Sequence, residues 1–449
     1  MRRSTPSPEE TATDRPGDER EDLRGSRLLV VCHDFPPVRS PQAIRALAFA
    51  RRLAPRVAEL HVLTRTRLPG GTEPTLPANV VLHRCPPGRF EALLDRLAAR
   101  RLPAAAGPAD AAVAAVPAVR PPRLNWKGRL VALARRAHDL LRFPDGRAAW
   151  AAPARRRLRA LCGQSPPDLA LVMHEPAASL LLADELTRRG IPWLADLADP
   201  VLAPYTPRHW RGRAARLETR VIAGAGAVTV TNPATAALLA RRHGRRAEAF
   251  TVIPQGFETR PAPPPPPRDG PLRLLYTGRF YRFRDPGALL RAVLDTPGVV
   301  LEIAGPEMPG AVLEAAARHP DRIRLHGELE HAAALALQPG ADVLASVGNA
   351  GTEQAPGKVQ EYFGAGRPVL HVFHDPADPA PSLLAETGRG LACPAEPVAI
   401  AACLRQLQAL KASGALATHF TLDPARVAAL EWDALVARLA AVLAGLRRA

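Results

Sequence analysis

Short apolar runs alternate with amphipathic stretches along most of this chain. Uninterrupted apolar runs are typical of strands buried on both faces, and apolar residues at three- and four-residue spacing, as in residues 43–53 and 179–190, predict helices. Strands that alternate with helices predict an α/β fold with parallel sheets covered by helices. The predicted strands are residues 27–35, 59–66, 168–175, 192–200, 227–232 and 249–257, then 273–280, 299–305, 322–329, 342–348 and 368–373.

A proline-rich segment divides this pattern into two halves. Residues 260–270 include five consecutive prolines, Pro263 to Pro267. Proline lacks a backbone N–H and fixes φ, so the segment predicts a stiff polyproline II linker between two domains that face a cleft. The predicted organisation is a disordered tail at 1–26, a first domain at 27–259, the linker at 260–270, a second domain at 271–430 and a C-terminal helix at 431–449.

The composition narrows the class of protein. The first residues are rich in proline and charge and lack an apolar segment, so we expect no signal peptide. No run of 18 or more apolar residues predicts a bilayer span. The five cysteines show no metal-like spacing and are expected to be reduced thiols, which favours a cytoplasmic location.

The chain is strongly basic, with 60 lysines and arginines against 43 aspartates and glutamates and a net charge of +17. The positive electrostatic potential of such a chain favours anionic partners, namely nucleotides, phospholipid surfaces or nucleic acid. A general overuse of arginine explains most of this charge, since basic residues are spread along the whole sequence. The aromatic content of 4% argues against a surface that stacks single-stranded bases, so we predict no nucleic-acid partner.

Residues 351–369 carry the strongest functional signal. Glu353 and Glu361 lie eight positions apart around a loop-to-helix junction, and the helix predicted at 357–365 ends at Gly366. The free N–H groups of a helix start bind anions, and carboxylates accept hydrogen bonds from sugar hydroxyls. One glutamate alone is usually just solvated, but this arrangement indicates a nucleotide-sugar site.

The same stretch, GTEQAPGKVQEYFGAGRPV, resembles the Glu-x7-Glu region of the family 4 retaining glycosyltransferases. The resemblance implies the GT-B fold, with two Rossmann-like domains facing a cleft and a C-terminal helix that returns to the first domain. It also implies that Glu353 contacts the donor sugar near the reacting centre, that Glu361 contacts the ribose, and that Lys358 belongs to the donor site.

A second resemblance follows the first strand of the second domain, in TGRFYRFRDP. Family members carry an arginine and a lysine there that hold the donor diphosphate. Arg279 occupies the first position and Arg284 replaces the lysine, next to a turn at Gly278. VIPQGF matches a turn of the family before the linker, where Gly256 is expected to approach the nucleotide. Because no Asp-x-Asp motif occurs, we predict no metal and no cofactor.

His174 lies at the end of a predicted strand in the tripeptide HEP, which some family members carry near the donor sugar. A lone histidine is more often structural, but the strand-end position favours a catalytic role. Asp196 and Asp199, in DLADP, are candidates to orient an acceptor hydroxyl, or else they cap the next helix.

The loop of residues 33–46 resembles the family's opening loop but lacks its glycine pair. Arg39 or Arg45 is expected to compensate for the missing phosphate contact, Arg45 from the acceptor side.

Residues 126–143 form a basic amphipathic pattern. It fits a helix on an anionic membrane, and it fits equally a helix docked on the protein's own core.

Taken together, these features predict a metal-independent retaining glycosyltransferase using a UDP- or GDP-linked sugar. The acceptor would be a sugar, a lipid-linked or a small molecule, in cell-envelope polysaccharide, glycolipid or natural-product glycosylation. The expected location is the cytoplasm, with peripheral contact at the inner face of the plasma membrane if the basic helix docks there. The alternatives are a GT-B nucleotide-sugar epimerase and a non-catalytic protein that binds surfaces through its charge.

Overall fold

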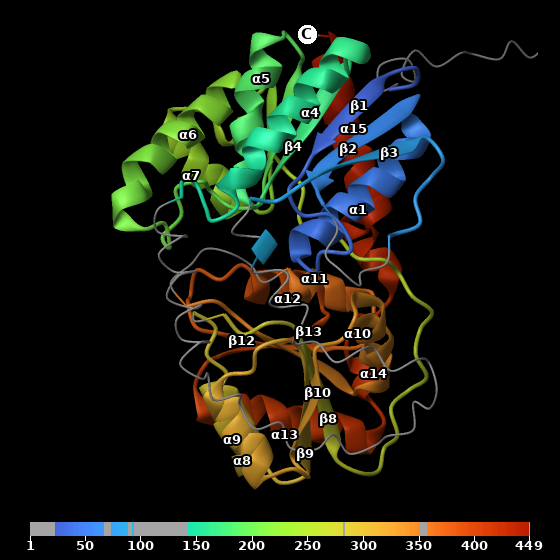
Figure 1. The fold of residues 1–449 in the computed structure, drawn as a ribbon. Coiled ribbons are helices and arrows are strands. Elements are labelled where there is room, and N and C mark those ends of the chain that lie inside the picture. The colour runs from blue at the N-terminus through green and yellow to red at the C-terminus, as the bar shows by residue number, and fades with distance from the viewer. Residues whose placement is uncertain are drawn as a thin grey trace, which may run out of the picture.

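The computed structural model describes residues 23–66, 73–88, 92–93, 142–281, 283–350 and 357–448. These residues form two parallel β-sheets, one of seven strands from the first half of the chain and one of six from the second. Figure 1 shows the two units one above the other, each with helices packed around its sheet. The prediction of an α/β protein with two Rossmann-like domains is confirmed.

In the first sheet, the order of the parallel strands reverses near the centre. Its strands are β1 (Arg27–Val31), β2 (Glu59–Arg65), β3 (Val80–Cys85), β4 (Leu169–His174), β5 (Trp193–Leu197), β6 (Ala227–Val230) and β7 (Phe250–Val252). The helices are α1 (Pro41–Leu53), α4 (Ala151–Gln164), α5 (Ala183–Arg188), α6 (Arg211–Gly224) and α7 (Pro233–His243). The order β3-β2-β1-β4-β5-β6-β7 reverses between β1 and β4, the kind of position where α/β proteins bind ligands.

The second sheet repeats this plan. Its strands are β8 (Leu272–Thr277), β9 (Val299–Ala304), β10 (Ile323–Gly327), β11 (Val343–Val347), β12 (Val369–Phe373) and β13 (Gly390–Pro394). The helices are α8 (Gly287–Asp295), α9 (Gly310–Arg318), α10 (His331–Leu337), α11 (Lys358–Phe363), α12 (Ala380–Thr387), α13 (Pro397–Ser413) and α14 (Leu416–His419). The order β10-β9-β8-β11-β12-β13 reverses between β8 and β11.

The last helix, α15 (Trp432–Arg448), returns to the first domain as predicted. Figure 1 shows it in red, rising beside the first sheet. Leu435, Leu439 and Leu443 repeat every four residues, so they share one face, and all three are fully buried in the core beneath that sheet. The ring of Trp432 meets Phe49 of α1 edge-on at 6.0 Å.

The proline linker lies against the second domain. Pro263 and Pro266 are half-buried and the prolines between them are exposed, which matches the three-residue turn of a polyproline II helix. Arg367 anchors the linker, because its guanidinium donates to the backbone oxygens of Pro264 and Pro339, both at 2.8 Å.

Two predicted segments lie partly outside the described residues. Residues 23–26, the end of the predicted tail, pack on the first domain instead, since the Leu23 side chain is buried in its core. Only Arg142 and Phe143 of the predicted basic helix are described, so its membrane and core alternatives both stay predictions. No helix among the described residues combines the length and the apolar character needed to span a bilayer.

Candidate functional site

A tight turn ends strand β8 at the point where the second sheet reverses. Gly278 has a φ of +151°, which favours glycine, and its carbonyl oxygen lies 1.9 Å from where a Cβ on Gly305 would be. The turns after β8 and β9 therefore touch backbone to backbone. The turn after β8 lies at the carboxyl edge of the sheet where the strand order reverses, which is the position where α/β proteins bind ligands.

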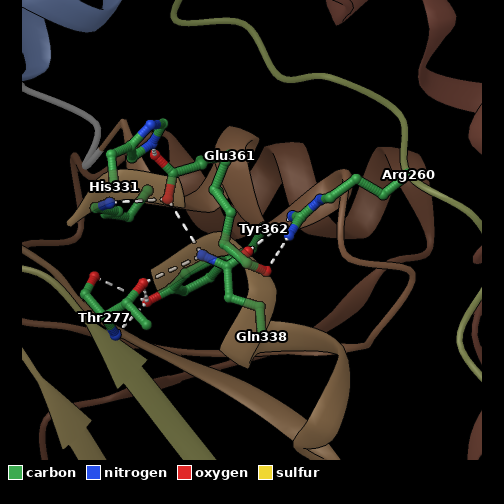
Figure 2. Close-up of polar contacts among 8 residues, drawn as sticks. Arg260, Thr277, His331, Gln338, Glu361 and Tyr362 are labelled. Atoms are coloured by element: carbon green, nitrogen blue, oxygen red, sulfur yellow. Dashed lines mark hydrogen bonds and ion pairs between the residues drawn. The ribbon is translucent and has the colours of Figure 1, made fainter. Parts of the chain in front are cut away.

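Glu361 on α11 is a buried carboxylate surrounded by hydrogen-bond donors (Figure 2). Its Oε1 accepts from Lys358 Nζ at 2.8 Å and Gln338 Nε2 at 3.2 Å, and its Oε2 lies 3.1 Å from His331 Nε2. Burial alone would raise the pKa of Glu361, but Lys358 and His331 outweigh it and hold this pKa well below its usual range. Because a carboxylate offers about four acceptor positions, about one remains for a ligand hydroxyl.

Lys358 joins this carboxylate to the turn after β8. It begins α11, and its Cε would lie 3.6 Å from a Cβ on Gly278. The ammonium group therefore lies between Glu361 and the turn, where an anion bound at the turn would meet it. The structure brings together three of the predicted donor-site residues: Gly278, Lys358 and Glu361.

The two predicted phosphate-binding arginines have different surroundings. Arg284 is buried, with Nε and Nη2 donating to Asn349 Oδ1 at 3.1 and 2.8 Å and Nη1 donating to the Arg279 carbonyl at 3.2 Å. Arg279 is exposed and pairs only loosely with Glu307, at 3.4 Å. We conclude that Arg284 shapes the backbone of the turn, whereas Arg279 is an exposed cation next to it. Asn349 lies just past the end of β11, and no motif in the sequence pointed to it.

His174 ends strand β4 and is almost fully buried. Its Nδ1 lies 2.9 Å from the Asp199 carbonyl oxygen. A carbonyl only accepts hydrogen bonds, so Nδ1 carries the proton. In the neutral ring, Nε2 is then an acceptor, and it has no hydrogen-bond partner among the described side chains and backbone groups.

Two carboxyl groups beside His174 share one tyrosine hydroxyl. Tyr205 Oη lies 3.0 Å from Glu175 Oε1 and 3.0 Å from Asp199 Oδ2. Burial and the nearby charge of Glu175 raise the pKa of Asp199 to about 7, although the Tyr205 hydrogen bond opposes this. Asp199 thus bonds a tyrosine rather than capping a helix. Glu175 could have been noticed in the HEP tripeptide, but nothing in the sequence pointed to Tyr205.

This raised pKa predicts a pH dependence of stability. The folded protein keeps a proton that the unfolded chain releases near the ordinary aspartate pKa of 3.8, so the free energy of unfolding should fall as pH rises from about 4 to about 7. In Asp199→Asn, the free energy of unfolding should fall less with rising pH, because the Asp199 contribution is gone. Asp184→Asn, on the exposed side of α5, should show the same fall as the wild type. Urea titrations at about pH 5 and about pH 8 measure the difference. An equal fall in the wild type and Asp199→Asn would contradict the assignment.

Asp196 and Arg45 bind each other inside the first domain. Arg45 Nε and Nη2 meet the two Asp196 oxygens at 2.8 Å each, and Thr229 Oγ1 donates to Oδ1 at 2.7 Å. Arg45 also donates to the backbone oxygens of Ile253 and Pro254 at 2.9 Å. Both ion-pair side chains are 0% exposed, so neither can touch an acceptor in this structure. We assign them to holding α1, β5 and the end of β7 together.

Three further predicted residues have other surroundings. At Gly256, a Cβ would lie 2.6 Å from Trp432, so glycine there makes room for α15, and its approach to a nucleotide stays a prediction. Arg39 pairs with Glu328 and Glu330 of the second domain rather than facing a phosphate site within its own loop. Glu353 lies outside the described residues.

Within the described ranges, no group of three or more histidine, cysteine, aspartate or glutamate side chains is placed to hold a metal ion.

Solved structures share this architecture across nearly the whole chain. Sucrose-phosphate synthase from Thermosynechococcus elongatus is 16% identical, with 93% of this chain and 98% of that chain covered and a TM-score of 0.64. The UDP-forming trehalose-phosphate synthase of Burkholderia vietnamiensis is 14% identical, with 94% and 99% covered and a TM-score of 0.60. HepE of Anabaena, solved with UDP-glucose, is 13% identical, with 94% and 100% covered and a TM-score of 0.59.

These likenesses show that the chain has the GT-B fold. No protein-family model matches the sequence, and no curated protein is detectably similar to it.

Proposed function

We propose that this protein is a retaining, metal-independent glycosyltransferase that takes a sugar from a UDP- or GDP-linked donor. The observation that carries the proposal is the group formed by Glu361, Lys358 and the Gly278 turn at the carboxyl edge of the second sheet. It combines an ionised carboxylate with about one free acceptor position, a cation and a tight turn, which suits a ribose next to a diphosphate. The structures of HepE with UDP and with UDP-glucose support a donor of this class in a protein of this fold.

In this proposal, each part of the site has one task. Glu361 accepts a hydrogen bond from the ribose, while Lys358 and Arg279 neutralise the charge that grows on the departing diphosphate. The bond between the anomeric carbon and the diphosphate oxygen breaks, and the acceptor oxygen bonds to the same face of that carbon. The proton of the acceptor hydroxyl leaves with the nucleoside diphosphate.

Residues of the first domain are proposed to contact the donor sugar and the acceptor. His174 presents Nε2 to the donor sugar, and Glu353 of the second domain contacts the same sugar, as the family resemblance implies. Asp199, with Glu175 and Tyr205, lies beside His174 and orients the acceptor hydroxyl. We propose that the acceptor is a sugar, a lipid-linked molecule or a small molecule, and that the protein works in the cytoplasm.

A transfer assay tests this function. The protein is incubated with a panel of UDP- and GDP-sugars and simple sugar or lipid-linked acceptors, and release of the nucleoside diphosphate is followed. We expect one donor to be consumed and its product to keep the anomeric configuration of the donor, as read by NMR. A product of inverted configuration would contradict the retaining assignment, and a donor converted to its 2-epimer would favour an epimerase.

A further inference from the structure

Gln338 lies between the linker and the proposed nucleotide contact. It begins the short 3-10 helix Gln338–Gly340 and is 0% exposed. Its Nε2 donates to Glu361 Oε1 and to Thr277 Oγ1, both at 3.2 Å, and its Oε1 accepts from Arg260 Nη2 at 2.8 Å. Figure 2 shows the amide of Gln338 with Arg260 on one side and Glu361 and Thr277 on the other.

These partners allow the amide only one orientation. If it were flipped, its oxygen would face the Glu361 carboxylate and its NH₂ group would face the Arg260 guanidinium, and both contacts would be repulsive. Arg260 is itself fixed, because its second terminal nitrogen donates to the Leu335 carbonyl. The first residue of the linker therefore sets which end of the amide meets Glu361.

The same amide also reaches the turn that ends β8. Thr277 is the last residue of that strand, and its backbone N–H donates to Tyr362 Oη at 2.9 Å. Tyr362 follows Glu361 directly on α11, so a shift of the Gln338 amide would move the carboxylate and the strand end together. The contacts join linker, carboxylate and turn into one buried polar network.

We propose that Gln338 is a positioning residue for Glu361 and that Arg260 fixes its orientation, so that ribose recognition depends on the hydrogen bond between Arg260 and this amide. The inference rests on the proposed function, because it takes Glu361 as the ribose contact. Neither Gln338 nor Arg260 needs to touch the nucleotide. Their effect is to hold the carboxylate in the one position where it meets the ribose.

The test compares nucleotides that differ in one ribose hydroxyl. UDP and its 2′-deoxy and 3′-deoxy analogues, or the GDP series if GDP binds instead, are titrated into the full-length protein by calorimetry. We expect the wild type to bind the parent nucleotide about tenfold more tightly than one analogue, as for a lost hydrogen bond to a charged group. Gln338→Met and Arg260→Met should shrink this ratio to about threefold or less, and Arg260→Lys should restore part of it.

Arg367→Met is the matched control. Arg367 anchors the same linker to the same 3-10 helix, but through the backbone oxygens of Pro264 and Pro339 and not through the Gln338 amide. It should lower Tm yet keep the wild-type ratio. The double variant Arg260→Met/Gln338→Met should lose no more discrimination than Gln338→Met alone, since both act through one amide.

Failure of the positioning role and failure of the proposed function give different results. An unchanged ratio in Arg260→Met overturns the positioning role, and this holds even if Gln338→Met does not fold. Equal loss of discrimination in Arg367→Met would also overturn it, since linker anchoring alone would then explain the effect. If the wild type binds neither UDP nor GDP, the proposed function fails instead.

Discussion

Replacing Lys358 with methionine is expected to lower kcat by about 10²–10³-fold, the scale for losing one preorganised charge donor in an active site. Methionine has a similar length, so α11 keeps its packing while the cation beside the Gly278 turn is lost. Most of the effect should appear in kcat, because the diphosphate gains charge only as the glycosidic bond breaks. Steady-state transfer kinetics with the preferred donor measure it.

Two further variants show whether charge or packing causes the loss. Lys358→Arg keeps the cation and should retain more activity than Lys358→Met. Arg279→Met should lower kcat as well, since this exposed arginine is the second cation at the turn. An Lys358→Met variant with wild-type kcat would place the diphosphate elsewhere.

Replacing Arg45 with methionine is expected to cost about 3–5 kcal/mol in the free energy of unfolding, the usual result of leaving one partner of a buried ion pair without its charge. Arg45 meets both oxygens of Asp196 and two backbone carbonyls, and neither ion-pair side chain is exposed. The loss should appear in urea denaturation as a lower midpoint with an unchanged slope.

A second arginine of the same helix serves as the control. Arg52 pairs with Glu258 and Asp433, whose side chains are largely exposed, so Arg52→Met should cost at most about 1 kcal/mol. Arg45→Met/Asp196→Leu should be less destabilised than Arg45→Met, because no unpaired charge is then buried. If Arg45→Met and Arg52→Met lose the same free energy of unfolding, the buried ion pair contributes no more to stability than the exposed one.

The sheets could be predicted because strands buried on both faces are largely apolar. Strands β4 and β5 are buried along their whole length, and their apolar residues at Leu169–Met173 and Trp193–Ala195 were visible in the sequence. The end of α11 was predicted only approximately, because the helix ends at Phe363 with Gly364 as its cap, whereas the residue of positive φ, Gly366 at +65°, lies three positions past the helix.

The partners of charged residues could not be predicted, because they depend on contacts between distant segments. Asp196 at a strand end resembled a ligand-binding carboxylate, but its partner Arg45 lies 151 positions earlier in the sequence. Nothing local distinguishes such an aspartate from Asp199, which meets Tyr205 instead. The buried amides of Gln338 and Asn349 gave no signal either, since their roles arise only from the folding of the second domain around Glu361 and Arg284.

The central claim, a nucleotide site built around Glu361, is tested most directly by calorimetric titration of UDP and GDP into the wild type and Glu361→Ala. We expect one of the two nucleotides to bind the wild type with a Kd between about 1 µM and 1 mM, the usual range for enzyme substrates, and Glu361→Ala to bind it at least about tenfold more weakly. Glu302→Ala is the control, because Glu302 is also a buried, ion-paired glutamate of the second domain but lies on β9, bonded to Arg273 and His326. It should keep the wild-type Kd. Binding of neither nucleotide to the wild type, or equal binding to the wild type and Glu361→Ala, would contradict the claim.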